Sequence, residues 1–429
     1  MSIRDDVMKM KAAAPYLAAT SNDTRENALR LIAERLREGA DRIFAANAKD
    51  LEAAEEAGIS PAIVGRLKFN EHKLSDCING IEQLIKLEDP LGKVTLARQL
   101  DEGLDLYRIT CPIGVIGVIF EARPDALVQI SSLCLRSGNC AVLKGGKETA
   151  ESNRVLFEII HDAAVEAGLP AECLLQAEQH SEIDELLGCH GYVDLLIPRG
   201  SNAFVQYIMD NTKIPVMGHA DGICHTYVDH SFDEQQAIKI IIDAKTQYTA
   251  ACNATETLLV HRDAAPALLP KLAAALKEAG VRLNGTEEVR SIIGAESLEN
   301  VISGEDFRKE YLDLVLAIKL VDSVEEAIDH INKFGSHHTD SIISDDDANI
   351  KKFMQLVDSA DVYANCSTRF ADGFRYGFGA EVGISTSKIH ARGPVGLEGL
   401  VTYKYNLYGH GQIVADYAEG RSSFNFKEL

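Results

Sequence analysis

The sequence predicts an α/β protein in which a parallel sheet carries helices on both faces. One observation is alternation: beyond residue 104, short strand-like apolar runs alternate with helical segments. The other is length, because 429 residues exceed what a single hydrophobic core usually holds, so two domains are expected. The composition, with 46% hydrophobic and 25% charged residues, is that of an ordinary globular chain.

The chain up to about residue 90 is predicted to be helical. Residues 27–36 repeat apolar side chains at three- and four-residue spacing. Asp23, followed three residues later by Glu26, predicts a capping box at the start of this helix. The Pro-Leu-Gly sequence at 90–92 ends the helical region.

The alternating region predicts two α/β units. In the first, residues 140–143 predict a buried strand, and residues 148–167 predict a helix that Gly168 and Pro170 terminate. The second unit is expected to begin with a helix at 233–247. The strands predicted over both units are residues 104–110, 113–120, 140–143, 193–197, 216–217, 226–228, 255–261, 314–321, 341–344 and 361–364.

Residues 399–416 predict a strand or arm outside both units. Tyr403, Tyr405 and Tyr408 are expected to be exposed along it. Because an apolar segment outside the cores is a candidate contact surface, we expect a homo-oligomer.

Composition also argues against several classes of function. A net charge of −22 disfavours nucleic acid as a partner, since phosphate neutralisation needs a basic face. Residues 1–16 predict an amphipathic helix and the longest apolar stretch, about residues 111–120, is too short to cross a bilayer, so no membrane association is expected. The nine cysteines contain no CxxC pair, which favours a reduced, cytoplasmic protein without a metal site.

Two short segments are candidate phosphate-binding turns. The sequence contains neither GxGxxG nor GxxxxGK[ST]. Lys144-Gly145-Gly146-Lys147 and Arg199-Gly200-Ser201 nevertheless each lie where a predicted strand meets a helix, which is where open α/β sheets bind ligands. Each is as often a plain turn, but two at successive strand ends favour a phosphate-bearing cofactor.

Cys252 is the candidate nucleophile. It lies in a loop of small residues between a predicted helix and an apolar strand, where a thiol can be reached and nearby N–H groups can hold an oxyanion. Most free cysteines are small core residues, and we assign Cys111, Cys134 and Cys140 to that class.

A glycine-rich segment, residues 369–386, contains Arg369 and Arg375. Arginines in such a loop suit the capture of a carboxylate. A surface loop without function has the same composition, so both interpretations stand.

Several of these segments together resemble one family. PIGVIGVIFEARPD at 112–125, GNCAVLKGGKE at 138–148, the segment around Cys252 and FGAEVGIST at 378–386 resemble the signatures of the gamma-glutamyl phosphate reductase family, within the aldehyde dehydrogenase superfamily. The resemblance extends from the N-terminal helices to Tyr405.

The resemblance implies an aldehyde-dehydrogenase-like fold of three parts. A Rossmann-type NADP-binding domain is expected at residues 1–103 and 121–232, with part of 367–395. A catalytic domain carrying Cys252 is expected at 233–366. Residues 104–120 and 396–418 are expected to form a small β oligomerisation arm.

The resemblance also implies roles for single residues. Cys252 corresponds to the nucleophile and Lys144, followed by Gly145, to the lysine that binds the adenosine ribose. Lys147 stands where NAD-preferring relatives often carry a glutamate, and an ammonium group there favours the 2′-phosphate of NADP. The remaining cofactor positions implied are Arg199, Gly200 and Ser201 at the pyrophosphate and Glu310 at the nicotinamide ribose.

Two positions depart from the general superfamily pattern. Ala122 stands near the position of the oxyanion asparagine, which leaves the Cys252 backbone N–H and Asn253 as donors. His219 stands near the position of the general base of hydrolytic members, and we expect it to be structural.

The function implied is the NADPH-dependent reduction of L-glutamyl 5-phosphate to L-glutamate 5-semialdehyde through a Cys252 thioester, the second step of proline biosynthesis. Arg123, Arg369 and Arg375 are candidate substrate-binding residues, and a glutamate 5-kinase is a possible partner. The alternatives are a hydrolytic NAD(P)-dependent aldehyde dehydrogenase, a non-catalytic nucleotide-binding module and a cysteine hydrolase.

Overall fold

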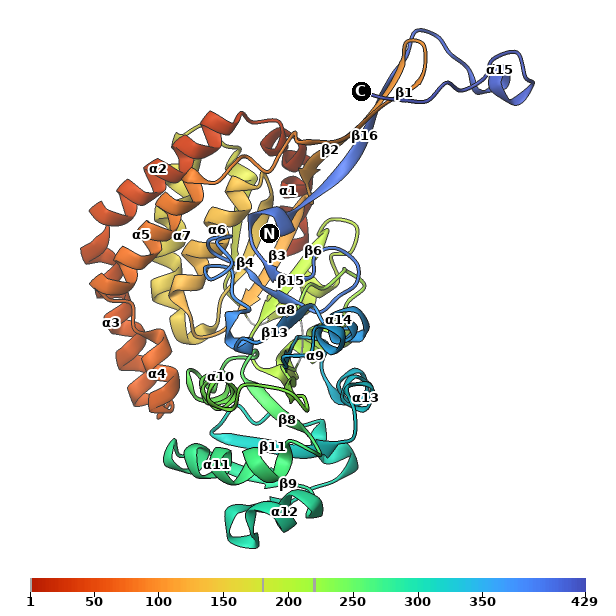
Figure 1. The fold of residues 1–429 in the computed structure, drawn as a ribbon. Helices are drawn as coiled ribbons and strands as arrows, with labels where there is room; N and C mark the ends of the chain where they lie inside the picture. Colours follow the sequence, from red (N-terminus) through yellow and green to blue (C-terminus); the bar gives the residue numbers. More distant parts are fainter. Residues whose placement is uncertain (1, 180, 219–220) are drawn as a thin grey trace. The chain divides into compact units, whose positions relative to one another are not determined.

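The computed structural model describes residues 2–179, 181–218 and 221–429, and the chain forms two compact units (Figure 1). Unit 1 comprises residues 1–217, 378–383 and 395–429. Unit 2 comprises residues 218–377 and 384–394. The length-based expectation of two domains therefore agrees with the number of compact units.

Unit 1 begins with helices, as the apolar spacing predicts. They are α1 (Ile3–Ala18), α2 (Asn22–Glu38), α3 (Ala40–Glu56), α4 (Pro61–Leu67) and α5 (Glu71–Lys86). The predicted capping box at Asp23 is wrong: the N-cap of α2 is Ser21, whose hydroxyl accepts a hydrogen bond from the Thr24 N–H. Asp23 lies instead in the first turn, where its charge favours the positive end of the helix dipole.

A four-stranded parallel sheet lies in unit 1, in the order β5-β4-β3-β6. All residues of β3 and β4 are buried, as expected of strands covered on both faces. The predicted strand at 216–217 is reduced to a single bridge between Leu196 and Val216. The elements are β3 (Val115–Phe120), α6 (Pro124–Arg136), β4 (Cys140–Lys144), α7 (Ala150–Glu166), β5 (Leu174–Ala177), α8 (Ser181–Leu187), β6 (Leu195–Arg199) and α9 (Asn202–Asp210).

A second, antiparallel sheet of unit 1 has the order β16-β2-β1-β17. It consists of β1 (Val94–Asp101), β2 (Leu104–Pro112), β16 (Val401–Tyr408) and β17 (Lys427–Glu428), with the short helix α15 (Val414–Ala418) between the last two. This sheet differs from the predicted arm boundaries because β3 turns away into the parallel sheet after Gly114, whose φ of +132° suits glycine. Figure 1 shows β1, β2 and β16 extending away from helices α1–α7 of their own unit, with α15 near the far end of these strands.

Unit 2 contains a seven-stranded parallel sheet in the order β10-β9-β11-β8-β7-β12-β13. Its strands are β7 (Cys224–Val228), β8 (Thr255–His261), β9 (Arg282–Gly285), β10 (Asn300–Val301), β11 (Val315–Val321), β12 (Thr339–Ile343) and β13 (Asp361–Ala364). Its helices are α10 (Glu234–Thr246), α11 (Ala265–Glu278), α12 (Glu287–Ile293), α13 (Val324–Phe334) and α14 (Asp347–Leu356). The boundary at 232/233 that was predicted between the domains differs from this division, because β7 pairs with β8 and β12 and so lies in unit 2.

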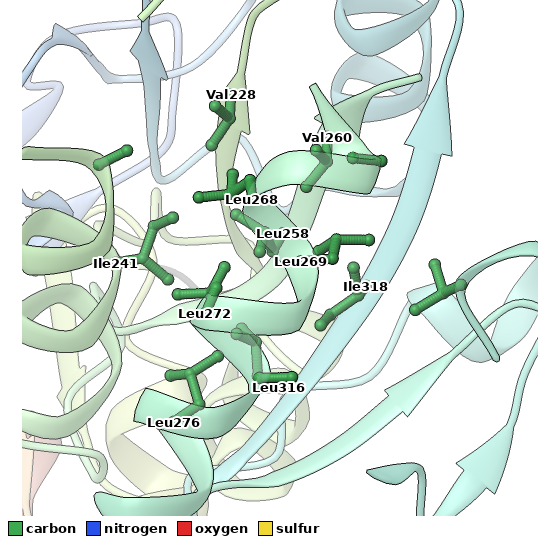
Figure 2. Close-up of a cluster of buried hydrophobic side chains, with 14 of the residues drawn as sticks. Val228, Ile241, Leu258, Val260, Leu268, Leu269, Leu272, Leu276, Leu316 and Ile318 are labelled. Atoms are coloured by element: carbon green, nitrogen blue, oxygen red, sulfur yellow. The ribbon is translucent and has the colours of Figure 1, made fainter. Parts of the chain in front are cut away.

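The apolar core of unit 2 fixes α11 against the sheet. Figure 2 shows Leu268, Leu272 and Leu276 of α11 facing Leu258 of β8 and Leu316 of β11, and all five side chains are fully buried. The i, i+4, i+8 spacing on the helix gives one apolar stripe. The short segments β14 (Gly383–Ser385) and β15 (Gly393–Val395) form a two-stranded sheet where the chain passes between the units.

Two features are absent from the part of the chain that the structure describes. No helix is long and apolar enough to cross a membrane. No group of three His, Cys, Asp or Glu residues is arranged to hold a metal ion.

Candidate active site

Cys252 lies in the loop 247–254, between the end of α10 and the start of β8, as its sequence position predicts. It is partly exposed, as are Cys111 and Cys366, while the other six free cysteines are buried. Burial raises the pKa of both Cys111 and Cys366, and that of Cys134 to about 12. A raised pKa makes these three thiols poor nucleophiles. Cys252 combines partial exposure with the loop position that the sequence predicts.

The backbone of Gly222 lies directly against the backbone of Cys252. A Cβ atom at position 222 would lie 2.0 Å from the Cys252 carbonyl oxygen and 2.5 Å from its Cα. Two positions on, Cys224 at the start of β7 donates its thiol hydrogen to the same carbonyl oxygen at 3.2 Å. The segment leading into β7 therefore contacts the backbone of the Cys252 loop at two points. Only glycine fits at position 222, because any side chain there would overlap Cys252.

Glu310 reaches the same place from another segment. Its Oε1 accepts a hydrogen bond from the Gly222 N–H at 2.9 Å. The predicted nicotinamide-ribose residue and the predicted nucleophile thus contact the same glycine in unit 2.

Asn253, the predicted second oxyanion donor, is buried. Its side-chain nitrogen donates to the Ala371 carbonyl at 2.7 Å. In this geometry the amide ties the Cys252 loop to the turn after β13, and one of its N–H groups is committed there.

Arg369 and Arg375 come together beside the Cys252 loop. Arg369 is buried, donates from Nε to Gln247 Oε1 at 2.9 Å, and its guanidinium carbon lies 5.9 Å from the centre of the Tyr248 ring. Arg375 donates from Nη1 to the Arg369 carbonyl at 2.8 Å.

Electrostatics link this arginine pair to the thiol. Burial lowers the pKa of the Arg369 guanidinium, Arg375 lowers it further, and Cys252 acts in the opposite direction. Cys252 therefore lies within electrostatic range of a buried cation, which suits an anionic substrate.

The predicted cofactor residues of unit 1 lie at or follow the carboxyl ends of β4 and β6, the two parallel strands that flank β3. Lys144 ends β4, is buried, and donates from Nζ to the Gly145 carbonyl at 2.6 Å. Burial lowers the pKa of its ammonium group. Lys147 begins the 3₁₀ turn Lys147–Thr149, and its side chain is exposed to solvent.

The start of α9 already holds a carboxylate oxygen. The Ser201 N–H donates to Glu121 Oε2 at 3.3 Å, and a Cβ at Gly200 would lie 2.6 Å from the same oxygen. The helix start therefore fits an anion, as a pyrophosphate site requires. Arg199 contributes differently, because its Nη1 donates to the Val382 carbonyl at 2.8 Å.

Two further residues were singled out in the sequence, Arg123 as a substrate-binding candidate and His219 as a structural residue. Arg123 lies in unit 1 at the N-cap of α6, where it pairs with Asp125 at 3.1 Å. The prediction for His219 falls outside the described residues.

Sequence reasoning missed Glu121, beside the predicted cofactor residues of unit 1, and three residues of unit 2 around the Cys252 loop: Gly222, Lys245 and Glu256. Glu256 offered a signal, since a glutamate inside the apolar strand-like run 255–261 has to find a partner. That partner is Lys245 of α10, at 2.6 Å. Gly222 offered none, because its close contact with Cys252 is visible only in three dimensions.

The fold and the partly exposed thiol define a class, the two-unit α/β enzymes that carry a nucleophilic cysteine, and comparison with known proteins agrees. The family model described as "Aldehyde dehydrogenase family" matches residues 2–304. This family uses nicotinamide cofactors.

Full-length relatives narrow the class. The gamma-glutamyl phosphate reductase of Acetivibrio thermocellus is 54% identical over 429 residues, covering 100% of this chain and 99% of the relative. That of Pelotomaculum thermopropionicum is 53% identical and covers 100% and 98%. The crystal structure of the Thermotoga maritima gamma-glutamyl phosphate reductase is 38% identical, covers 96% of this chain and 100% of that one, and superposes with a TM-score of 0.93.

The chain therefore belongs to the aldehyde dehydrogenase family of oxidoreductases and, within it, to the gamma-glutamyl phosphate reductases. The resemblance and the fold class predicted from the sequence are both confirmed.

Proposed function

We propose that this chain reduces L-glutamyl 5-phosphate to L-glutamate 5-semialdehyde and phosphate with NADPH, the second step of proline biosynthesis from glutamate. The observation that carries the proposal is full-length similarity to gamma-glutamyl phosphate reductases combined with a partly exposed Cys252 beside the buried Arg369.

In the proposed reaction the Cys252 thiolate attacks the acyl phosphate carbonyl. The bond from this carbon to the phosphate oxygen breaks, phosphate leaves, and a thioester remains on Sγ. A thioester carbonyl is weakly stabilised by resonance, so it accepts hydride more readily than a carboxylate. Collapse of the resulting thiohemiacetal releases the aldehyde and returns the thiolate.

The surrounding residues would place charge where the reaction needs it. The Cys252 backbone N–H, and the remaining N–H of Asn253, would face the developing oxyanion, where one lost donor costs roughly 10²–10³ in rate. Arg369 and Arg375 would bind the α-carboxylate or the phosphate of the substrate, with Arg123 as a third candidate.

A bound nicotinamide cofactor would supply the hydride. Unit 1 would hold it through Lys144, Gly145, Lys147, Arg199, Gly200 and Ser201, and Glu310 would contact the nicotinamide ribose. The carboxylate-accepting start of α9 supports the pyrophosphate assignment. The exposed charge of Lys147 supports NADP over NAD, because an ammonium group attracts a 2′-phosphate.

Three further assignments belong to this proposal. The protein would work in the cytoplasm, as a homo-oligomer formed through the β16-β2-β1-β17 sheet. A glutamate 5-kinase could dock to pass on its labile acyl phosphate.

The test is an assay of NADPH formation from glutamate 5-semialdehyde, with and without inorganic phosphate. We expect activity only with phosphate, because phosphate must resolve the thioester in the reverse direction. Cys252→Ala should lower kcat by about 10⁴-fold or more while NADPH still binds. The matched control is Cys366→Ala, a second partly exposed thiol of unit 2, which should retain activity.

Either of two outcomes would overturn the proposal. Full turnover in Cys252→Ala would show that Cys252 is not the nucleophile. Turnover independent of phosphate would instead favour a hydrolytic aldehyde dehydrogenase.

A further inference from the structure

We propose that the buried pair Lys245–Glu256 is a positioning device that holds the Cys252 loop and the Glu310 segment in a fixed relation to each other. The inference rests on the proposed function, because it takes the roles of Cys252 and Glu310 from there. In the proposed reaction neither Lys245 nor Glu256 touches the reacting atoms.

The ion pair closes the base of the loop that carries Cys252. Lys245 lies in the last turn of α10 and Glu256 is the second residue of β8, so they flank the loop 247–254 on both sides. Lys245 Nζ lies 2.6 Å from Glu256 Oε2, and the two side chains are 0% and 1% exposed. A buried contact of this length fixes how the two ends of the loop meet.

The second oxygen of the same carboxylate reaches a different segment. Glu256 Oε1 accepts a hydrogen bond from the Leu312 N–H at 3.1 Å. Leu312 has a φ of +53° and a 42% exposed side chain. A left-handed leucine that gains little from burial needs an external restraint, and Glu256 provides one.

The Leu312 turn is connected back to Cys252. Two residues earlier, Glu310 accepts the Gly222 N–H at 2.9 Å, and Gly222 lies against the Cys252 backbone. Glu256 therefore acts on both sides of Cys252: directly on its loop through Lys245, and indirectly through Leu312, Glu310 and Gly222.

A purely structural role explains the pair poorly. Two apolar residues of similar volume usually hold a buried position as well as an ion pair does, and often better. An apolar pair could close the loop, but it could not accept the Leu312 N–H. Burial raises the pKa of Glu256 to about 7 and lowers that of Lys245, which reflects the cost of keeping charge at this place.

The experiment compares two double variants that differ mainly in one carbonyl group. K245M/E256Q and K245M/E256L both remove the two buried charges, but only the glutamine keeps an acceptor for the Leu312 N–H. Hydrogen exchange of residues 308–314, measured without cofactor, reports how firmly the segment is held. The KM for NADPH and kcat report the consequence for the reaction.

We expect both variants to melt at similar temperatures. Exchange of 308–314 should be about tenfold faster in K245M/E256L than in K245M/E256Q, since the restraint on Leu312 is lost. The KM for NADPH should be higher in K245M/E256L than in K245M/E256Q, and this fold-change should exceed the fold-change in kcat by a factor of about ten. In a Glu310→Ala background this difference in KM should vanish, because coupled residues are non-additive.

One control variant and one fallback variant complete the experiment. Glu299→Gln alters an exposed carboxylate outside the measured segment, which pairs with Arg282 at 3.0 Å, and should change neither exchange nor KM. Should K245M/E256L not fold, the two double variants are compared in a Leu312→Gly background, because glycine adopts a φ of +53° without strain. There the turn needs less restraint, and the difference in exchange of 308–314 should shrink to about threefold or less.

Equal exchange and equal KM in the two double variants would overturn the inference, as would additivity with Glu310→Ala. Absence of NADPH turnover in the unaltered protein would instead count against the proposed function. The hydrogen-exchange comparison tests the positioning role whether or not the protein turns over NADPH.

Discussion

Gly222 carries no functional group, yet its missing side chain decides how closely the chain can approach Cys252. The segment before β7 and the Cys252 loop are in backbone contact there. The Glu310 carboxylate binds the N–H of the same glycine. A change at this residue is therefore expected to move Cys252, the proposed nucleophile, without altering any of the groups proposed to react.

Gly222→Ala should lower kcat about 100-fold, because a misplacement of about 1 Å costs that much in a positioned reaction. The added Cβ would lie 2.0 Å from the Cys252 carbonyl oxygen, so one of the two backbones must shift. Steady-state kinetics with a thermal melt would measure this. Gly80→Ala in α5, where nothing lies within 4 Å of the new Cβ, is the control and should keep full activity. Normal kcat in Gly222→Ala would show that the contact does not position Cys252.

Glu121→Gln should tighten the binding of NADPH by about threefold to tenfold. Its carboxylate oxygen lies 3.3 Å from the Ser201 N–H at the start of α9, where it competes with an anionic ligand. Glutamine removes the repulsive charge and keeps the size. Titration of NADPH fluorescence, with NADP as competitor, would measure the affinity. Weaker binding in the variant would mean that Glu121 supports the cofactor instead of competing with it.

At the residue scale, the sequence predicted what short motifs encode. Cys252 and the lysines of KGGK are recognisable because their neighbours in sequence set their surroundings. Gly222 and Glu256 were missed because the residues that explain them come from distant segments. Glu121 was quoted within a motif, but its contact with Ser201 joins the ends of β3 and β6, which sequence order does not place together.

At the scale of elements, strands buried on both faces were the most predictable. β3, β4 and β11 are nearly continuous apolar runs, which a parallel sheet between helices requires. β1 was missed because its residues are only partly buried and mix polar with apolar side chains. The short strands β5 and β17 gave too few residues for a period to show.

Helix α13 provides a test of pH dependence. His330 on this helix packs between the rings of Phe307 and Phe334, and burial lowers its pKa from 6.5 to about 2. The folded state therefore keeps the ring neutral, while the unfolded chain protonates it below about pH 6.5. Its contribution to stability is present above that pH and is lost as the pH falls toward 2, by at most about 1.4 kcal/mol per pH unit.

His330→Phe should flatten the loss of stability between about pH 6.5 and 4.5. A phenylalanine keeps the ring and binds no proton, so the unfolded state gains nothing on acidification. Denaturant midpoints at several pH values would measure the slope. His72→Ala, at a side chain that is 82% exposed, is the control and should leave the slope unchanged. A slope equal to that of the unaltered protein would show that His330 does not govern the acid response.

At the scale of the whole molecule, chain length predicted two units but could not place their border. β7 follows unit 1 in sequence, yet both strands that pair with it, β8 and β12, come later in the chain. The border therefore depends on pairing between distant segments, which alternation of helices and strands does not reveal. The antiparallel sheet has the same property, since β2 pairs with β16 across most of the sequence.

The β16 edge of that antiparallel sheet is a candidate surface for assembly of the protein. β16 lies at its edge with only β2 as a neighbour, so a row of backbone groups on its other side is open to pairing. Tyr403 and Tyr405 are 53% and 56% exposed on this strand. Their ring centres lie 5.7 Å apart, with one ring edge-on to the other. An apolar edge of this kind is costly to leave in water, which is why we expect it to be covered by a second copy of the chain.

Changing Tyr403 and Tyr405 to Glu should convert the homo-oligomer to a 46.8 kDa monomer, because like charges would meet across the shared edge and each subunit would lose its aromatic contact. Sedimentation equilibrium would measure the mass, and the melting temperature of the isolated chain would report whether both units remain folded. Tyr16→Glu, at a tyrosine of α1 that is 74% exposed, adds a charge elsewhere on unit 1 and should leave the mass unchanged. If the double variant keeps the oligomeric mass, the subunits meet through another surface; if the unaltered chain is already a monomer, the exposed edge has a different partner.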